Sequence, residues 1–485
     1  MKLTCAQRRF NLPRPDNPLS PRVHAMRSVQ PLPTERIGLL LLLIISYLVV
    51  SYAQQQKPLL ASTLQPSLSL RHIYHHSSST GKYPNMFRRM DYSGIQALQI
   101  ADNLGKPYTF SVKQNLGRRY RPASPLPYLM RAAQTPRQMH YAMGIHNMEI
   151  DYGLLPDVAD SDTVLSLAEM TNNAYSDPDT REDWYDLGTK WNVTSSFGWE
   201  SDGLRGHVFG DPDNTTFVLS FKGTSAGLWT GGPTGEKDKF NDNLLFSCCC
   251  ARVSRAWRTV CDCFVGNTYQ CNQTCLETSL LDEETYYSLA MKVYIELADQ
   301  YPDATIWLSG HSLGGSVASL VGQTFGVPTV TFEIPGERLA SRRFHLPAPP
   351  AINWDDIPLW HFGHTADPLF VGVCTGPSST CWYGGFAMET RCHTGKVCVW
   401  DVVNEKGWRV DIRSHRIHDV IENILKKPEE FPIPECKQEL ECVDCALWDY
   451  PDDRDPPSTI STSCSTIPEI PDPTEDPWKR KKYRQ

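Results

Sequence analysis

The sequence has 485 residues, a formal net charge of −8 at pH 7 and 16 cysteines. A chain of this length can bury a large core, and one α/β domain with long tails fits it as well as two or three average domains. The negative net charge argues against a nucleic-acid partner, which would favour a basic surface.

The N-terminal end combines a basic leader with an apolar stretch. Residues 1–36 hold seven Lys or Arg against two acidic residues, and residues 37–52 carry no charge. As a helix this stretch would rise about 24 Å, slightly less than the hydrocarbon core of a bilayer at about 30 Å. A cleavable signal peptide would also fit. The long basic leader favours an uncleaved transmembrane signal anchor over residues 37–53, with residues 1–36 cytosolic and the rest lumenal.

The cysteines agree with a lumenal location. Only Cys5 precedes the apolar stretch, and fifteen follow it in clusters within 248–275, 374–398 and 436–464. This density is typical of disulfides in an oxidising compartment. The odd count predicts at least one thiol that is free or pairs with another chain. A zinc site at Cys442-Val-Asp-Cys445 is disfavoured because no second such pair or nearby histidine accompanies it.

Three N-x-S/T sequons also lie beyond the apolar stretch, at Asn192, Asn214 and Asn272. A single sequon is a weak signal, but the common position of all three supports a secretory-pathway lumen. We therefore expect glycosylation at these asparagines.

Composition divides the remainder of the chain into three parts. Residues 54–144 are largely polar with little periodicity, which predicts a lumenal stalk and edge elements of a domain. Residues 145–430 carry the pattern of a globular domain. Residues 431–485 contain cysteines but are rich in Pro and Asp, so this tail is expected to be mostly disordered.

Helical and β-type patterns alternate within the globular part. Helical spacing of apolar residues occurs around 164–175, 283–301, 313–325 and 417–425. Apolar β-prone runs occur at 215–221, 305–308, 327–334 and 359–362. This alternation predicts a mostly parallel central sheet flanked by helices.

The run Gly310-His-Ser312-Leu-Gly314 lies between a predicted strand and a predicted helix. A nucleophilic serine on a strained strand-to-helix turn needs small neighbours two residues away on either side, so that the backbone bends and exposes the hydroxyl. We therefore interpret Ser312 as the nucleophile of an α/β-hydrolase fold. A glycine-rich turn without chemistry is the alternative.

In this fold the acid follows the serine and lies on a loop after a later strand. Asp367 follows the strand at 359–362 and is the preferred candidate. Asp355 and Asp356 precede that strand and would lie at the wrong edge of the sheet. Two further acids, Asp401 and Asp411, flank what resembles a hairpin.

The base should be a histidine near the end of the domain, beside the start of a helix. His415 fits because it directly precedes the last predicted helix. His418 falls in the first turn of that helix and stays a rival, and His393 is a third histidine after the acid. His311, next to the nucleophile, is expected to support the turn rather than to act as base.

An oxyanion hole should combine the backbone N–H of Leu313 with a donor at the end of an earlier strand. Lys222-Gly223-Thr224 ends the strand at 215–221, so the Thr224 N–H and hydroxyl are both candidates. The alternative is an ordinary turn. The reaction that these residues predict requires no metal or cofactor.

Together these motifs resemble the fungal class 3 lipases over roughly residues 160–425. The resemblance rests on Phe221-Lys-Gly-Thr224, Gly310–Gly315, Asp367-Pro368 and His415. The autophagy-related branch of that family is the more similar part, through the N-terminal anchor, Cys248-Cys-Cys250, Thr331–Gly336 and Ser414–Asp419.

The resemblance implies a triacylglycerol lipase and phospholipase whose triad is Ser312, Asp367 and His415. Such a protein would pass from the endoplasmic reticulum and Golgi through multivesicular bodies to the vacuole, and would act on lipids of autophagic bodies and internal vesicles. Two departures from the family pattern are Lys222, where Arg is usual, and His418, where Tyr is usual.

Two questions stay open at the level of sequence. Leu228-Trp229 and Leu244-Leu-Phe246 would suit either a lipid-opened lid or ordinary core packing. The chain would also fit another serine hydrolase, such as a thioesterase or peptidase, or a membrane-tethered glycoprotein with an inactive pocket.

Overall fold

The computed structural model describes residues 65–91, 110–123, 148–175, 202–225, 234–253, 257–266, 268–348 and 354–452, all within one compact unit. The basic segment 1–36 and the expected anchor at 37–53 lie outside these residues. Among the residues that are described, no helix combines the length and apolar character needed to cross a membrane.

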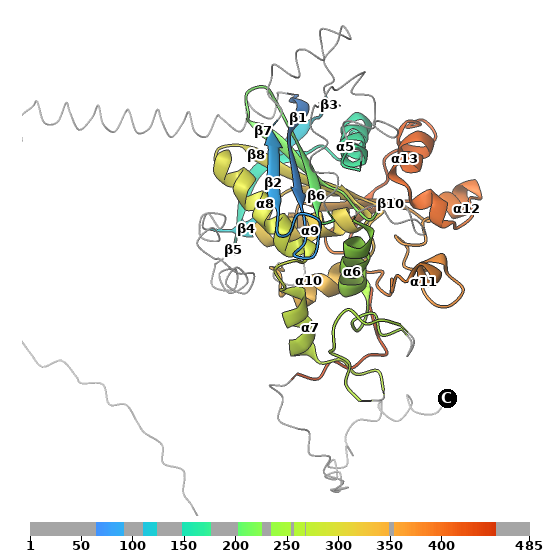
Figure 1. Cartoon of the computed structure of the whole chain (residues 1–485). Coiled ribbons are helices and arrows are strands. Elements are labelled where there is room, and N and C mark those ends of the chain that lie inside the picture. The colour runs from blue at the N-terminus through green and yellow to red at the C-terminus, as the bar shows by residue number, and fades with distance from the viewer. Residues whose placement is uncertain are drawn as a thin grey trace, which may run out of the picture. The chain divides into compact units, whose positions relative to one another are not determined.

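A mixed ten-stranded sheet forms the centre of this unit (Figure 1). The strand order is β12-β11-β10-β9-β8-β7-β6-β1-β2, and β3 pairs with β1. The central strands run parallel to one another: β7 (Thr216–Phe221), β8 (Thr305–His311), β9 (Thr329–Phe332), β10 (Leu359–His364) and β11 (Lys396–Trp400).

The outer strands of this sheet pair antiparallel. They are β1 (Ser67–His76), β2 (Phe87–Asp91), β3 (Phe110–Ser111), β6 (Arg205–Gly210) and β12 (Cys436–Lys437). The expected parallel sheet is therefore correct for the centre and wrong for the edges. Strand pairs such as β1–β2 and β6–β7 are joined by short connections, and a short connection permits only antiparallel pairing.

The described part of residues 54–144, where the sequence predicts a stalk and edge elements, contributes several strands. Besides β1, β2 and β3, this range contributes β4 (Gln114–Pro122), which pairs antiparallel with β5 (Met148–Pro156) in a separate two-stranded sheet. Two ion pairs between these strands join Arg119 and Arg121 to Asp151.

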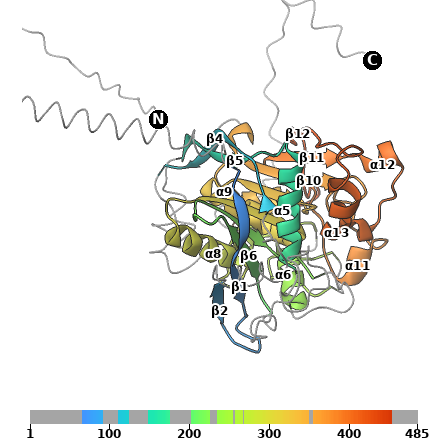
Figure 2. The same ribbon diagram turned by 90° about the horizontal axis from the view of Figure 1, so that it is seen from above.

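Helices cover both faces of the large sheet (Figures 1 and 2). One face is covered by α8 (Tyr286–Gln300) and α9 (Ser312–Phe325), with α6 (Gly235–Phe246) beside them. The other face is covered by α5 (Ser161–Asn173) and α13 (Ile417–Val420), which continues into a turn of π-helix at Ile421–Leu425.

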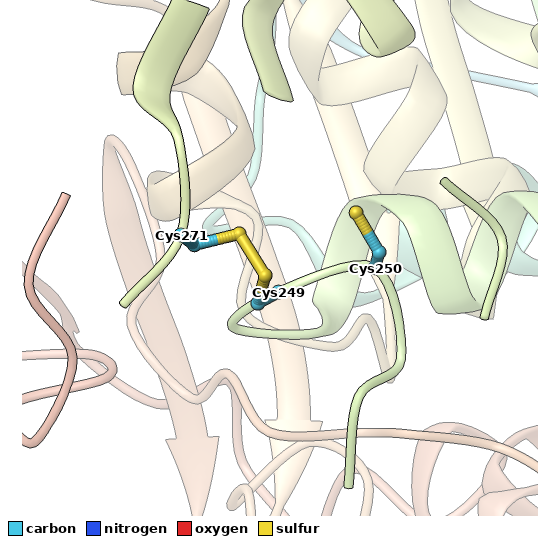
Figure 3. Close-up of side chains that lie close together, drawn as sticks. All are labelled: Cys249, Cys250 and Cys271. Atoms are coloured by element: carbon cyan, nitrogen blue, oxygen red, sulfur yellow. A yellow bond between two sulfur atoms is a disulfide. The ribbon is translucent and has the colours of Figure 1, made fainter. Parts of the chain in front are cut away.

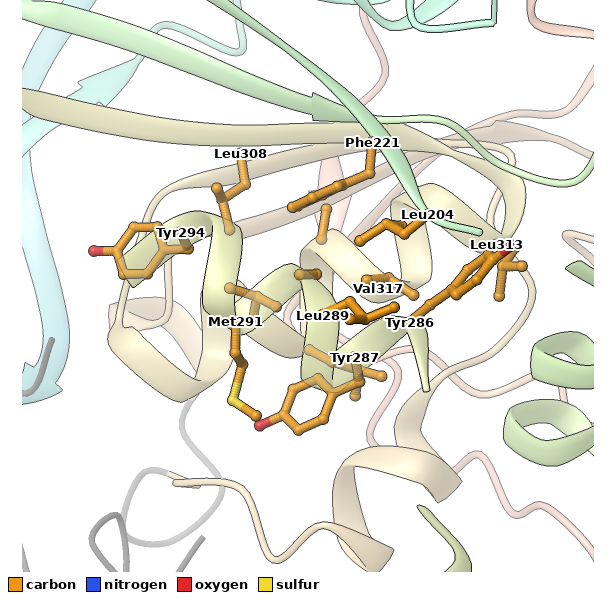
Figure 4. Close-up of a cluster of buried hydrophobic side chains, with 14 of the residues drawn as sticks. Leu204, Phe221, Tyr286, Tyr287, Leu289, Met291, Tyr294, Leu308, Leu313 and Val317 are labelled. Atoms are coloured by element: carbon orange, nitrogen blue, oxygen red, sulfur yellow. The ribbon is translucent and has the colours of Figure 1, made fainter. Parts of the chain in front are cut away.

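Strand β7 shows why two cores form. Successive side chains of a strand point to opposite faces of the sheet. Leu219 and Phe221 accordingly belong to the core under α8 and α9, and Val218 belongs to the core under α5. Figure 4 shows Phe221 and Leu308 of the sheet above residues of the two helices, including Leu289 and Val317.

Most of the expected helices and strands are confirmed to within a few residues. Side-chain caps begin several of the helices; in α5 and α8, for example, Asp160 accepts from Thr163 N–H and Thr285 accepts from Ser288 N–H. The remaining short elements are α7 (Gln273–Leu280), α10 (Arg338–Arg343), α11 (Thr380–Gly384), α12 (Val402–Lys406) and 3-10 turns at Trp354–Asp356 and Ile412–His415.

The hairpin expected around Asp401 and Asp411 is wrong. Asp401 instead caps α12, where its side chain accepts from Asn404 N–H, and this helix follows β11 directly. The capping carboxylate satisfies a free N–H of the first helical turn. The short helix therefore replaces the turn of a hairpin.

The expected tail begins too early, because residues 431–452 belong to the domain. Disulfides Cys398–Cys436, Cys392–Cys442 and Cys248–Cys445 fasten this segment, and β12 pairs with β11. Covalent links hold a segment whose Pro- and Asp-rich composition would not bury enough apolar surface alone. Residues 453–485 lie outside the described part of the chain.

All fourteen cysteines in the described part of the chain form seven disulfides. Besides the three above, the pairs are Cys249–Cys271, Cys250–Cys261, Cys263–Cys275 and Cys374–Cys381. Figure 3 shows the first of these beside Cys250. The sulfurs of Cys249, Cys250 and Cys271 are close enough to hold a metal ion, but a zinc ligand must be a thiolate. Cys5 and Cys464 lie outside the described residues.

Candidate active site

The turn between β8 and α9 has the shape of a nucleophile elbow. Ser312 lies at the start of α9 with φ 55°, in the left-handed region that a side chain disfavours. A Cβ at Gly310 would lie 2.6 Å from the backbone of Gly314, and a Cβ at Gly314 would lie 2.5 Å from the carbonyl carbon of Lys222. Both positions therefore require glycine for the turn to close against the end of β7.

Three side chains from separate segments meet at this turn. His415 Nε2 is 2.9 Å from Ser312 Oγ, and His415 Nδ1 is 2.8 Å from Asp367 Oδ2. Asp367 follows β10, and His415 ends the 3-10 turn before α13. The structure thus brings together the three residues expected from the sequence, in the order that general-base activation of a serine requires.

Asp367 is fully buried behind the histidine. Burial alone would raise the pKa of its carboxyl group, but the facing His415 ring, with smaller contributions from Glu333 and His364, lowers the pKa to about 2. Its Oδ1 accepts a further hydrogen bond from Leu369 N–H at 2.9 Å. The ionised carboxylate fixes the ring with Nδ1–H toward Asp367, which leaves Nε2 free to accept the serine proton.

The rival acids and bases have other partners. His418 is half exposed on α13, with its ring 4.0 Å from Asp419. His393 is buried and donates to the Ile334 carbonyl at 3.1 Å. The rival acids face elsewhere: Asp356 pairs with Arg118, Asp411 with Arg413, Asp355 with Gln438, and Asp401 caps α12.

His311 supports the site through the backbone. Its Nε2 donates to the carbonyl oxygen of His415 at 2.6 Å, so its Nδ1 accepts from the Tyr175 hydroxyl at 2.7 Å. Burial lowers the pKa of His311 to about 3, which keeps the ring neutral. On the other side, His364 Nε2 donates to the Ser414 carbonyl at 3.1 Å. Two neutral histidines therefore hold the backbone that carries His415.

The expected oxyanion donors come from two separate segments next to Ser312. Leu313 is in the first turn of α9, where backbone N–H groups have no partner within the helix. Thr224 lines the same pocket as Ser312, and a Cβ on the preceding Gly223 would be 3.1 Å from Ser312 Cβ. Because the Thr224 hydroxyl donates to Asp242 Oδ2 at 2.6 Å, its backbone N–H is the better candidate.

A buried ion pair holds the segment that carries Thr224. Lys222 Nζ donates to the Gly223 carbonyl at 2.7 Å and lies 3.3 Å from Asp238 Oδ2. That same oxygen accepts from Ser225 N–H at 2.9 Å. Asp238 therefore anchors both ends of the turn, which fixes the position of the Thr224 N–H.

The pocket above Ser312 is narrow and largely apolar. Its lining consists of Thr224, Ser225, Asp242, Ser312, Leu369, Cys381, Phe386, Met388, Ile412, Arg413, His415 and Arg416. Of the two alternatives for residues 244–246, a lid or core packing, core packing is correct, because these residues lie on α6 and are buried in the core. Leu228-Trp229 lies outside the described residues.

Comparison with known proteins places this site in a family. Residues 254–327 match the family model described as Lipase (class 3). A curated protein of Yarrowia lipolytica named "Putative lipase ATG15" is 44% identical over 408 residues, which cover 79% of this chain and 73% of that protein. The chain belongs to the ATG15 family of class 3 lipases.

Other members of the ATG15 family match a smaller share of their own length. The protein of the same name from Pichia angusta is 50% identical over 322 residues, covering 66% of this chain and 60% of its own length. That of Saccharomyces cerevisiae (strain ATCC 204508 / S288c) is 50% identical over 316 residues, covering 64% and 60%. The chain thus spans about three fifths of these two relatives.

Among solved structures, the Lip2 lipase of Yarrowia lipolytica is 16% identical, covers 49% of this chain and 77% of its own, and aligns with a TM-score of 0.26. The lipase of Rhizopus microsporus var. chinensis is 14% identical, covers 49% and 74%, and aligns with a TM-score of 0.25. Alignments with such low scores transfer no residue roles to this chain.

Sequence reasoning missed several residues that shape the site. Tyr175 and His364 act through the hydrogen bonds described above, and Asp242 and Glu333 are buried carboxyl groups close to Thr224 and Asp367. Only Glu333 could have been singled out from the sequence, because it lies within the segment Thr331–Gly336 on which the family resemblance rests. The partners of the others are distant in sequence.

The sequons differ in their surroundings. Asn214 is exposed in the turn between β6 and β7. Asn272 caps α7, where its side chain accepts from Cys275 N–H at 2.7 Å. Asn192 lies outside the described residues. Glycosylation stays a prediction for all three.

Proposed function

We propose that this chain is a serine lipase that hydrolyses carboxylic esters of membrane phospholipids and triacylglycerols. The observation that carries the proposal is the position of His415, between Ser312 Oγ at 2.9 Å and Asp367 Oδ2 at 2.8 Å. Family membership supports a lipid ester as substrate. The apolar lining of the pocket suits an acyl chain.

The geometry suggests the sequence of steps. His415 Nε2 takes the proton of Ser312 as the hydroxyl oxygen attacks the ester carbonyl, and the N–H groups of Leu313 and Thr224 stabilise the negative oxygen that results. The protonated ring then gives its proton to the departing alcohol. A water molecule, deprotonated by the same ring, releases the fatty acid from Ser312.

We further propose that the protein works in the secretory lumen as an anchored type II membrane protein. It would travel through endoplasmic reticulum, Golgi and multivesicular bodies to the vacuole, where its partners are vesicle membranes and autophagic bodies. The seven disulfides support an oxidising compartment. The names of the relatives support a role in autophagy.

The test compares wild-type protein with Ser312→Ala on phospholipid vesicles, triacylglycerol emulsions and a soluble short-chain ester. The variant should lose all ester hydrolysis, because the nucleophile is gone, while secretion and melting temperature stay the same. Activity on the soluble ester alone would favour a different serine esterase. Full activity in the variant would overturn the proposal.

A further inference from the structure

Glu333 is an unusual residue behind the proposed triad. It directly follows β9, is fully buried and has φ 47°. A left-handed backbone is unfavourable for a residue with a side chain, and burial of a carboxyl group is unfavourable as well. Neither cost is needed to end a strand. Their coincidence at one residue beside the site suggests a function.

The contacts of Glu333 leave one carboxyl oxygen without a donor. Oε2 accepts from His364 N–H at 3.3 Å. Oε1 is 3.6 Å from His364 Nε2, which is too long for a hydrogen bond, and that nitrogen already donates to the Ser414 carbonyl. No donor faces Oε1 among the described residues. A proton on Oε1 would turn this buried acceptor into a donor.

The carboxylate of Asp367 is the acceptor for that proton. Glu333 and Asp367 are both fully buried, and they lie close enough for each to shift the pKa of the other. Two buried carboxyl groups that lie so close do not both ionise. Asp367 keeps the charge because His415 and the Leu369 N–H face it. Burial, followed by the Asp367 charge, raises the pKa of Glu333 well above its ordinary value.

We propose that Glu333 is a positioning residue of the triad, whose carboxyl group donates a hydrogen bond to Asp367 and thereby tunes His415 as the general base. The inference rests on the proposed serine-hydrolase function. The extra hydrogen bond draws part of the negative charge of the Asp367 carboxylate away from the His415 ring. The carboxylate therefore stabilises the protonated form of that ring less, and the ring can accept the serine proton at lower pH.

Among the described residues, three titratable groups surround the Glu333–Asp367 pair. His364 comes from the end of β10, His415 from the turn before α13, and His311 from β8. Burial lowers the pKa of His364 and of His311, so neither ring supplies a positive charge that would pair with an ionised Glu333. The proton on Glu333 is the arrangement that leaves the pair with a single negative charge.

The test compares Glu333→Gln, which keeps a donor of the same shape, with Glu333→Leu, which removes it. In the leucine variant, the acid limb of kcat/KM on a soluble ester should move up by about one pH unit, which lowers activity about tenfold at pH values below the limb. The glutamine variant should keep the wild-type limb. Glu337→Gln is the matched control, because Glu337 is also buried and follows the same strand but bonds to Ser319 and Thr394.

A second readout needs no activity. The titration midpoint of the His415 ring is followed by NMR in a Ser312→Ala background, where the leucine substitution should raise it and the glutamine substitution should not. Equal midpoints in both, or a glutamine variant shifted as far as leucine, would overturn the role of Glu333. If the wild-type protein hydrolysed no ester, that result would instead overturn the proposed function. If the leucine variant does not fold, Glu333→Gly removes the carboxyl where glycine tolerates the backbone.

Discussion

Different interactions stabilise two regions of this molecule, the catalytic edge and the cysteine-rich flank. The catalytic edge comprises the carboxyl ends of β7 to β10, where Ser312, Asp367 and His415 meet through hydrogen bonds from neutral histidines and buried carboxyl groups. The cysteine-rich flank comprises residues 248–275 and 436–452, and six of the seven disulfides have one end or both in these segments. Catalysis at the edge requires side chains that exchange protons, whereas the flank requires only covalent links that keep its segments folded.

This difference predicts that catalysis and stability separate along the chain. Substitutions at the edge should change rate and pH dependence with little effect on folding. Substitutions in the flank should change the free energy of unfolding with little effect on rate.

The largest effect is expected from the histidine at the edge. His415→Ala removes the base and should lower kcat on a soluble ester by at least about 10³-fold, because little general-base catalysis then remains. His418→Ala, three residues away on the exposed side of α13, is the matched control and should stay within about twofold. A reversed pattern would assign the base to His418.

The separation is tested by breaking one disulfide of the flank and one disulfide outside it, each with paired serine substitutions. Cys248–Cys445 spans 197 residues, so its loss should cost about 3–5 kcal/mol of unfolding free energy. Cys374–Cys381 spans only 7 residues and should cost about 2 kcal/mol. Since Cys381 lines the active-site pocket, the second pair should reduce activity more than the first. Chemical denaturation and ester assays give the two losses. A larger loss of stability without Cys374–Cys381, or a larger loss of activity without Cys248–Cys445, would contradict the separation of catalysis from stability.

A smaller effect is expected from Asp242, which joins the edge to α6. Burial raises the pKa of its carboxyl group to about 8. The group is therefore neutral in acid and gains a negative charge beside Thr224 as pH rises through 8. That charge would oppose a developing oxyanion, so activity should fall roughly tenfold on the alkaline side.

Asp242→Asn stays neutral and should lose this alkaline limb while keeping its activity in acid. The protonated form of Asp242 also stabilises the fold, fully so below the ordinary carboxyl pKa and no longer above pH 8. The melting temperature should therefore fall less between pH 6 and pH 9 in the variant. Identical pH profiles for the two proteins would exclude a charge-sensitive role.

The catalytic edge could be predicted from sequence because chain order constrains it. A serine between a strand and a helix, an acid after a later strand and a histidine before the last helix can meet only at one edge of a parallel sheet. The antiparallel strands β1 and β2 were missed because their polar residues hide the alternation that marks a strand. The short helix α12 was missed because its cap at Asp401 resembles a turn.

The flank could not be predicted in the same way. Disulfide pairing depends on which cysteines the folded chain brings within about 6 Å, and sequence spacing does not supply that information. Cys445, for example, pairs with Cys248 and not with its neighbour Cys442. Residues 431–452 were therefore assigned to the tail, although three disulfides fasten them. The buried partners of the triad, such as Glu333, likewise depend on tertiary contacts.

The most direct measurement is labelling of the folded protein with a fluorophosphonate, followed by mass-spectrometric mapping of the modified residue. An activated serine should be modified at Ser312 in the wild type, and labelling should disappear in His415→Ala while the melting temperature is unchanged. Modification at another serine, or no modification of folded wild-type protein, would contradict a catalytic centre built from Ser312, His415 and Asp367.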